Sequence, residues 1–330
     1  MQDSMSWLKV YQDSVDDELS GLYLPSRATS LERAVADALS AGGKRVRATL
    51  ALLWCEAYSG DYRPAIPIAV AYELAHASAL IQDDIIDHAD LRRGKESVVA
   101  KYGLSNAILA SDLLLFYVPK MVAKYTDLES ERLARLFDLV GDACRATTWG
   151  EFLDLEMARD DGWAEREYEE MIRLKTSTLL SAPCASGAIV GRAAEGQVSL
   201  ATRFGEAVGM AYQIQDDTLD IMGDESVLGK PVFTDLRGGK RSVVLMHCVS
   251  RCSHGDRRFV LSLFNRSGSY SKGEATRLRE LIETTGSLEY AREKMEHYTN
   301  EAKSALQSVP ESRAKSLLGD LTDYLATRYS

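Results

Sequence analysis

The sequence predicts an all-α protein, and three observations support this class. Apolar residues recur at helical spacing along most of the 330 residues, alternation typical of strands is almost absent, and most of the seven prolines lie at segment edges. We expect helices at residues 31–39, 46–58, 66–86, 107–125, 131–155, 164–180, 198–221, 240–249, 273–284 and 288–306. Since no low-complexity linker interrupts them, we expect one domain over residues 1–330.

Composition and charge exclude several classes of function. Hydrophobic residues make up 45% and charged residues 27%, which is ordinary for a globular protein. The net charge of −10, without a dense basic tract, argues against nucleic-acid binding. The first residues lack the features of a signal peptide, and Glu73 and His76 interrupt the longest apolar stretch, residues 65–81. We therefore expect a cytoplasmic protein without a transmembrane segment.

The five cysteines are scattered and odd in number, so they predict no disulfide framework. His247, Cys248, Cys252 and His254 lie near one another in the sequence and could in principle bind zinc. Their spacing matches no common zinc motif, so we expect ordinary core or surface thiols.

The most informative feature is an aspartate-rich segment that occurs twice. Residues 81–87 read IQDDIID and residues 214–220 read IQDDTLD. In a helix, the first and last aspartates of each copy share one face, and such like charges repel unless cations neutralise them. A solvated helix face is the simpler alternative, but it fits poorly because apolar neighbours predict that both helices are largely buried. The expected Mg²⁺ ligands are Asp83, Asp84, Asp87, Asp216, Asp217 and Asp220.

Basic residues accompany both acidic segments. Paired arginines follow the first motif, and a Gly-Gly turn before residue 46 precedes a helix start that favours anions. His76 lies two helical turns before Asp83 and so shares its face. Each basic group alone could be a solvated surface or, for the histidine, a core position. Together they supply cations for more than one diphosphate: Lys44, Arg47, His76, Arg92, Arg93, Lys175, Lys230 and Lys240.

These motifs together resemble the trans-isoprenyl diphosphate synthases of the polyprenyl synthetase family. The resemblance covers nearly the whole chain and runs, in order, through GGKRVR, DDIIDHADLRRGK, KTSTL, YQIQDDTLD and LGKPVFTD. A single D-D-x-x-D would be weak, since terpene cyclases also contain one, but the ordered set is specific. The resemblance implies an all-α helical barrel around a deep central cavity, with the aspartate motifs facing across its mouth, usually in a homodimer.

The resemblance also implies a role for each candidate. The six aspartates would bind a Mg²⁺ cluster that holds the diphosphate of an allylic substrate (dimethylallyl, geranyl or farnesyl diphosphate). Further ligands of that diphosphate would be Arg92, Lys175, Lys230 and Lys240. Isopentenyl diphosphate would be held by Lys44, Arg47, His76 and Arg93. Thr176 and Gln213 would steady the allylic cation formed by ionisation, which the isopentenyl double bond then attacks before a proton is lost.

Three positions depart from the family pattern. Gln82 stands where many relatives carry histidine, Glu151 follows Gly150 where glutamine is common, and Gln215 replaces a frequent basic residue. We expect these changes to alter metal affinity or pH dependence rather than to abolish activity.

Small residues before the first motif predict a long product. Ala75, Ser78 and Ala79 would line the tunnel in which the chain grows, and Phe116 or Tyr117 would close it deeper down, unless these aromatics are ordinary core. We expect geranylgeranyl diphosphate or a longer product. The alternatives are a class I terpene cyclase, which usually keeps only one aspartate-rich motif, and a non-catalytic subunit of a heteromeric synthase, which tends to lose aspartates.

Overall fold

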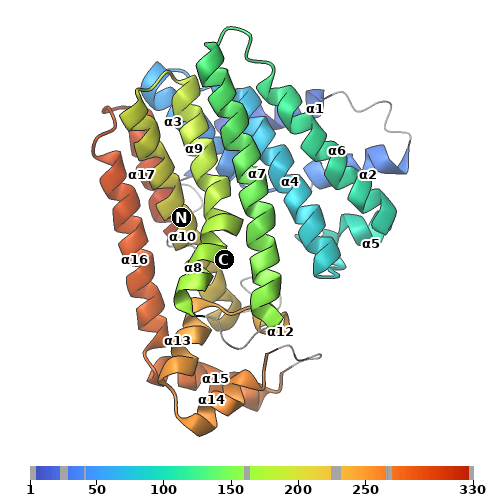
Figure 1. The fold of residues 1–330 in the computed structure, drawn as a ribbon, viewed down its shortest axis with the longest axis vertical. Coiled ribbons are helices and arrows are strands. Elements are labelled where there is room, and N and C mark those ends of the chain that lie inside the picture. Colours follow the sequence, from blue (N-terminus) through green and yellow to red (C-terminus); the bar gives the residue numbers. More distant parts are fainter. Residues whose placement is uncertain are drawn as a thin grey trace. The chain divides into compact units, whose positions relative to one another are not determined.

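A computed structural model describes residues 5–22, 29–40, 42–159, 164–223, 232–264, 266 and 270–326. Within these ranges the regular structure is helical except for one short antiparallel hairpin, β1 (Leu91–Arg92) and β2 (Lys95–Glu96), which confirms the all-α class (Figure 1). The helices are α1 (Leu8–Gly21), α2 (Ser30–Ser40), α3 (Val46–Ser59), η2 (Arg63–Ala65), α4 (Ile66–Ile86), α5 (Val98–Tyr102), α6 (Leu104–Val122), α7 (Ser130–Arg159), α8 (Glu165–Ile172), η3 (Arg173–Ser177), α9 (Thr178–Val190), α10 (Glu195–Met222), α12 (Thr234–Arg237), α13 (Val243–Arg251), α14 (His254–Leu261), α15 (Lys272–Thr284), α16 (Ser287–Leu306) and α17 (Arg313–Ala326).

The chain forms two compact units, each described by itself. Unit 1 comprises Met1–Arg145, Leu179–Gly205 and Ala305–Leu318. Unit 2 comprises Ala146–Thr178, Glu206–Ser304 and Gly319–Ser330. The expectation of one domain over residues 1–330 stays a prediction.

Unit 1 is organised around α4, which packs along α6 (Figure 1). Small residues at the contact, such as Ala107 and Ala110, are fully buried and allow the two helices to approach closely. On the other side, α3 packs against α4 and contributes the buried ring of Trp54. The last turn of α4 leads into the β1–β2 hairpin, so the first aspartate motif and the paired arginines come from adjacent elements.

Helix α4 is long and apolar. By length and composition alone, the segment Arg63–Ile86 could cross a membrane. Of its most apolar window, 67% is buried inside the protein. Core helices of globular proteins pass the same test, so the expected lack of a membrane span remains a prediction.

The core of unit 2 lies among α8, α10, α12, α13 and α15. Buried side chains from each of them meet there, including Tyr168, Ile214, Leu236, Val244 and Ile282. The helix expected at residues 164–180 is interrupted, because residues Arg173–Ser177 form a π-helical turn between α8 and α9. This turn carries the predicted site residues Lys175 and Thr176.

Candidate functional site

The first aspartate motif occupies the end of α4, in unit 1. Asp84 is buried, and its Oδ1 accepts hydrogen bonds from Arg92 Nε at 2.8 Å and Nη2 at 2.6 Å. Burial raises the pKa of Asp84, and the Arg92 guanidinium opposes that shift. Arg92 Nη2 also lies 3.1 Å from Asp83 Oδ2. Asp83 is only partly buried and Asp87 is exposed, so these two carboxylates are the accessible ones.

The glycine turn before α3 lies against the arginine hairpin in the same unit. A Cβ atom at residue 43 would stand 2.6 Å from Arg93 Nη1, so the close approach of Arg93 requires glycine there. Gly43 has a φ of 144°, which also favours glycine. Arg45 fixes the turn, because its guanidinium reaches the buried carboxylate of Glu73 at 3.1 Å and the Leu39 carbonyl oxygen at 2.8 Å.

His76 lies among the predicted diphosphate ligands of unit 1. Burial lowers its pKa well below 6.5, and the charges of Arg47, Arg93, Arg92 and Arg45 add to this effect. The imidazole is therefore neutral at pH 7, in a cationic environment. The structure thus places the predicted residues Arg47, His76 and Arg93 in one electrostatic cluster, while Lys44 is an exposed residue of the same glycine turn.

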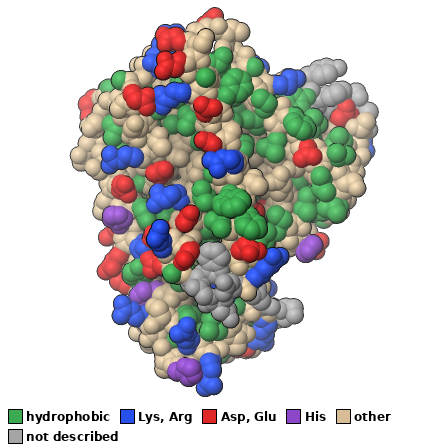
Figure 2. Space-filling view, in the orientation of Figure 1, with side chains coloured by type: hydrophobic (Ala, Val, Ile, Leu, Met, Phe, Trp, Pro, Cys, Tyr) green, Lys and Arg blue, Asp and Glu red, His purple; other side chains and the backbone are tan. Residues whose placement is uncertain are grey.

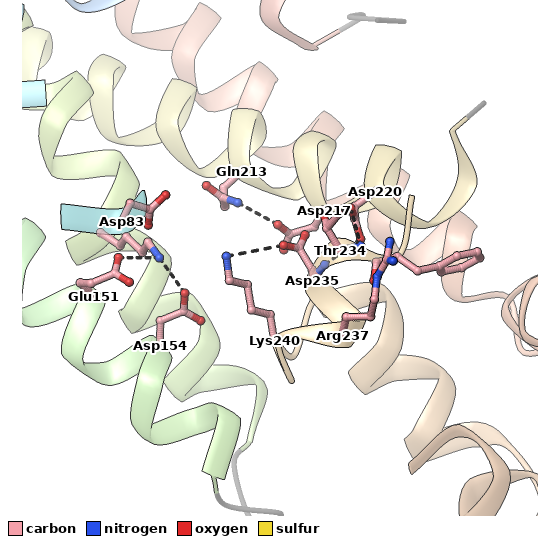
Figure 3. A network of polar contacts seen from close by, with 12 residues as sticks. Asp83, Glu151, Asp154, Gln213, Asp217, Asp220, Thr234, Asp235, Arg237 and Lys240 are labelled. Carbon is pink, nitrogen blue, oxygen red and sulfur yellow. Dashed lines mark hydrogen bonds and ion pairs between the residues drawn. The ribbon is translucent and has the colours of Figure 1, made fainter. Parts of the chain in front are cut away.

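The second aspartate motif lies on α10, in unit 2, and its three carboxylates differ. Asp217 is buried and accepts hydrogen bonds from the Tyr168 hydroxyl and from Gln213 Nε2, the latter at 2.8 Å (Figure 3). Burial raises the pKa of Asp217 well above its ordinary value, and the charge of Asp235 adds to the shift. Asp216 is partly exposed and borders a small crevice. Asp216 is thus the most accessible carboxylate of this motif.

Asp220 caps the short helix α12. Its Oδ1 accepts the Thr234 backbone N–H at 3.1 Å and the Thr234 hydroxyl, and its Oδ2 accepts the Asp235 N–H at 3.1 Å. Asp220 is only 1% exposed. This carboxylate therefore has its hydrogen-bonding capacity largely satisfied by protein donors.

Lys175 projects from the π-turn toward two acids of α7. Its Nζ lies 2.7 Å from Asp154 Oδ2 and 2.6 Å from Glu151 Oε2, and Figure 3 shows both carboxylates directed at one nitrogen. Two glycines bring the turn this close to its neighbours. A Cβ at Gly150 would be 2.3 Å from the Lys175 backbone nitrogen, and a Cβ at Gly209 would be 2.5 Å from the Ser177 Cα.

Thr176 and Gln213 are joined in one hydrogen-bond chain. The Thr176 hydroxyl donates to Gln213 Oε1 at 2.7 Å, Gln213 donates to Asp217, and Tyr168 donates to the other oxygen of Asp217. The chain fixes the rotamers of two of the three predicted catalytic side chains, the third being Lys175. Their oxygens can then face positive charge without reorganising.

The remaining predicted lysines have different outcomes. Lys240 Nζ lies 3.6 Å from Asp235 Oδ1, in unit 2 (Figure 3). Lys230 lies outside the described residues. The role of Lys230 stays a prediction.

The predicted chain-length residues are divided between interior and surface in unit 1. Ala75 and Ser78 are buried, and Ser78 Oγ lies 2.8 Å from Ser111 Oγ of α6. Ala79 is partly accessible. Phe116 is 70% exposed, contrary to the expectation that it fills an interior position. The helical phase of α6 turns residues such as Leu114 and Val118 inward and Phe116 outward, whereas Tyr117 is half-buried.

The donor set suits a hard divalent cation that arrives with an anion. Asp83, Asp87 and Asp216 offer accessible carboxylate oxygens, the ligands that Mg²⁺ prefers. Among the described residues, no cluster of three or more His, Cys, Asp or Glu side chains forms a ready-made metal cage. Mg²⁺ often takes only one or two carboxylates and completes its shell with substrate phosphate oxygens and water. His247 belongs to the group His247, Cys248, Cys252 and His254 that was considered for zinc. Its Nδ1 lies 2.9 Å from Ser287 Oγ.

Three residues of these clusters had no role assigned from the sequence: Asp154, Tyr168 and Asp235. Glu151 was expected only to alter metal affinity or pH dependence, not to pair with Lys175. Glu151 and Asp154 stand three residues apart, so helical spacing alone could have placed them on one face of α7. Tyr168 offered no such signal, because a tyrosine in an amphipathic helix is usually core.

Comparison with known proteins gives a consistent result. A family model described as polyprenyl synthetase matches residues 28–282. A short chain isoprenyl diphosphate synthase of Methanothermobacter thermautotrophicus is 33% identical over 328 residues, which is 99% of each chain. A geranylfarnesyl diphosphate synthase of Aeropyrum pernix is 32% identical, covering 88% of this chain and 92% of its own. The crystal structure of geranylgeranyl pyrophosphate synthetase from Pyrococcus horikoshii has a TM-score of 0.92 and 32% identity, covering 99% of both chains.

Proposed function

Because the chain belongs to the polyprenyl synthetase family and is an isoprenyl diphosphate synthase, we propose that it condenses isopentenyl diphosphate with an allylic diphosphate to give geranylgeranyl diphosphate or a longer product. The observation that carries the proposal is that Arg92 pairs with Asp83 and Asp84 of the first aspartate motif. Beside the second motif, Lys240 pairs with Asp235, whose backbone N–H donates to Asp220. Two of the named relatives are described as geranylgeranyl and geranylfarnesyl diphosphate synthases, which supports the product range.

We propose that Asp83, Asp87 and Asp216 bind the Mg²⁺ ions of the allylic diphosphate. Bound Mg²⁺ would stabilise the negative charge that develops on the departing diphosphate. Asp84, Asp217 and Asp220 act one step further out, since protein donors already occupy much of their hydrogen-bonding capacity. Asp84 orients Arg92, and Asp217 orients Gln213.

The cationic side chains divide between the two substrates. The allylic diphosphate is held by Arg92, Lys175, Lys240 and, by resemblance, Lys230. The isopentenyl diphosphate is bound by Lys44, Arg47, His76 and Arg93. His76 enters this site as a neutral group, so it hydrogen-bonds the diphosphate without adding charge. Holding both substrates converts an encounter in solution into a reaction between positioned partners.

Thr176 and Gln213 stabilise the allylic cation with their oxygens. Their hydrogen-bond chain to Asp217 and Tyr168 holds these oxygens in place before ionisation, which avoids a reorganisation cost in the transition state. The isopentenyl double bond attacks the cation, and the proton that is lost passes to the released diphosphate. Water must be excluded, because it would quench the cation.

The active form that we propose is a homodimer. The outward face of α6 carries large apolar side chains, including Leu104, Ile108 and Phe116, and Figure 2 shows apolar side chains gathered over this helix. Contiguous apolar surface of this kind is typical of a protein interface. A second copy would cover Phe116, which explains its exposure better than a role as tunnel plug.

Product length depends on α4. Ser78 contacts Ser111 across the α4–α6 contact, and Ala79 is accessible beside it, so added bulk at either position narrows the space next to this helix. We expect Ser78→Phe combined with Ala79→Phe to shorten the product. An unchanged product length in this variant would show that the tunnel does not pass along these residues.

The direct test is incubation of the pure protein with Mg²⁺, labelled isopentenyl diphosphate and, separately, dimethylallyl, geranyl or farnesyl diphosphate. We expect a ladder of linear products that ends at one length. A cyclic hydrocarbon formed from the allylic substrate alone would instead identify a class I terpene cyclase. Failure to form any product would identify a non-catalytic subunit.

A further inference from the structure

Lys175 has more negative charge around it than it can neutralise. Its single ammonium group lies within 2.7 Å of two carboxylates, those of Glu151 and Asp154. The three side chains together carry a net charge of about −1 if all are ionised, in a position that is only partly solvated. Because like charges repel across such short distances, this triad opposes the approach of a further anion.

The two acids are not equivalent. The side chain of Asp154 is 8% exposed and that of Glu151 is 19% exposed. The less accessible carboxylate, Asp154, accepts a hydrogen bond from Lys175 Nζ at 2.7 Å and holds the ammonium in place. Since a more solvated carboxylate loses less when its ion pair is broken, Glu151 is the partner that Lys175 gives up first.

The close approach of α7 to the π-turn brings Glu151 next to Lys175. Gly150 precedes Glu151 directly, and it is this glycine that admits the Lys175 backbone. The Glu151 carboxylate therefore lies next to the Lys175 ammonium group before any substrate binds.

We propose that Glu151 is an affinity-determining residue that competes with the allylic diphosphate for Lys175. This inference rests on the proposed function, in which Lys175 binds that diphosphate. When the substrate arrives, Lys175 exchanges Glu151 for a diphosphate oxygen and keeps Asp154. Glu151 thus weakens the hold on the allylic headgroup and favours release of inorganic diphosphate and product. A glutamine at position 151 would keep the packing and a hydrogen-bond acceptor but remove the competing charge.

The test compares Glu151→Gln with wild type and with Glu151→Asp in steady-state kinetics with Mg²⁺. We expect Glu151→Gln to lower the KM for the allylic substrate by roughly three- to tenfold, as expected for the loss of one nearby, partly solvated charge. The KM for isopentenyl diphosphate should stay unchanged, because Glu151 competes for Lys175, which is not among the proposed ligands of that substrate. Glu151→Asp keeps the charge and should behave like wild type. Glu156→Gln is the matched control, since Glu156 lies on the same helix but pairs with Arg159 on the surface.

A second readout is inhibition by inorganic diphosphate with Mg²⁺, which occupies the headgroup position without any prenyl chain. Glu151→Gln should lower its inhibition constant against the allylic substrate by the same factor. An unchanged or raised allylic KM with normal folding would overturn the proposal. Asp216→Ala separates this from failure of the assigned function, because an enzyme that elongates normally without Asp216 would contradict the proposed metal site rather than the role of Glu151.

Discussion

Asp220 and Thr234 form a helix cap. The Asp220 carboxylate accepts both the backbone N–H and the hydroxyl of Thr234, which begins α12. The third aspartate of the second motif thus stabilises the fold of unit 2, although its place in D-D-x-x-D is equivalent to that of Asp87, which is exposed at the end of α4. The two copies of the motif have nearly the same sequence, but their third aspartates have different structural roles.

This difference predicts that two substitutions in the second motif act on different properties, one on stability and the other on turnover. Asp220→Ala leaves the Thr234 and Asp235 donors of α12 unsatisfied and should lower the free energy of unfolding by about 1 to 3 kcal/mol. Asp216→Ala should leave stability within about 0.5 kcal/mol, as is usual for an accessible side chain, and abolish most turnover. Thermal unfolding without Mg²⁺, together with turnover below the melting temperature, checks both. If Asp220→Ala kept its stability and lost only metal-dependent turnover, Asp220 would be a direct ligand.

The sequence was sufficient for several elements with long apolar periodicity, although α1, most of α9 and α17 were not predicted. The helix expected at residues 66–86 has these bounds in the structure, because its apolar residues continue without interruption to the first motif. Short or polar helices such as α5 and α12 were not predicted, since their few apolar residues give no clear period. The π-turn was also missed, because one extra residue in a turn does not change the spacing of apolar residues enough to be recognised.

The sequence named candidate site residues, but it did not predict their contacts. Spacing on α4 placed His76 and Asp83 on one face, and the structure puts the predicted His76, Arg47 and Arg93 in one electrostatic cluster. Which aspartate is capped, buried or accessible depends on residues far away in the sequence, such as Thr234 for Asp220. The outward position of Phe116 likewise depends on the rotational phase of α6, which several apolar residues in a row left undetermined.

The π-turn predicts a strong effect for one glycine of α10. Gly209→Ala would place a Cβ 2.5 Å from the Ser177 Cα, so the backbone of the turn must shift. We expect a loss of about 1 to 3 kcal/mol in stability, typical of overpacking, and at least a roughly tenfold loss of kcat/KM because Lys175 and Thr176 move with the turn.

Gly196→Ala on the same helix is the control for this substitution. Nothing lies within 4 Å of a Cβ at residue 196, so this change should stabilise the helix by about 0.5 to 1 kcal/mol and leave activity intact. The melting temperature and kcat/KM of both variants test whether the contact of Gly209 with Ser177 constrains the site. Equal behaviour of the two would mean that the approach of Gly209 to Ser177 does not constrain the site.

Phe116 predicts the position of the dimer interface. Phe116→Ser should leave the product length unchanged, because the side chain is 70% exposed rather than inside unit 1. It should also shift the protein toward a smaller species in analytical ultracentrifugation, since an exposed aromatic at an interface often carries much of the binding energy. Val10→Ser, on the exposed face of α1, is a matched apolar control that should change neither property. A shorter or longer product from Phe116→Ser would mean that this side chain lines the product tunnel.

His76 predicts how the stability of the ligand-free protein depends on pH. Burial and the charges of Arg47, Arg93, Arg92 and Arg45 lower its folded-state pKa well below 6.5. At a pH between the folded-state pKa of His76 and 6.5, the unfolded chain binds more protons than the folded protein. Protonation therefore favours unfolding. The contribution of His76 to stability is therefore complete above 6.5 and is lost progressively as the pH falls below that value.

The measurement is the free energy of unfolding of wild type and His76→Gln between about pH 5 and pH 8, without Mg²⁺ or substrates. Wild type should lose stability more steeply toward pH 5 than His76→Gln, because glutamine cannot take up the proton. His254→Gln, at an exposed position, should follow wild type and so reports on the other titrating groups. Bound isopentenyl diphosphate should reduce the difference, since its negative charge favours the imidazolium and raises the pKa of His76. Parallel curves for wild type and His76→Gln would mean that His76 is not held neutral by the arginines around it.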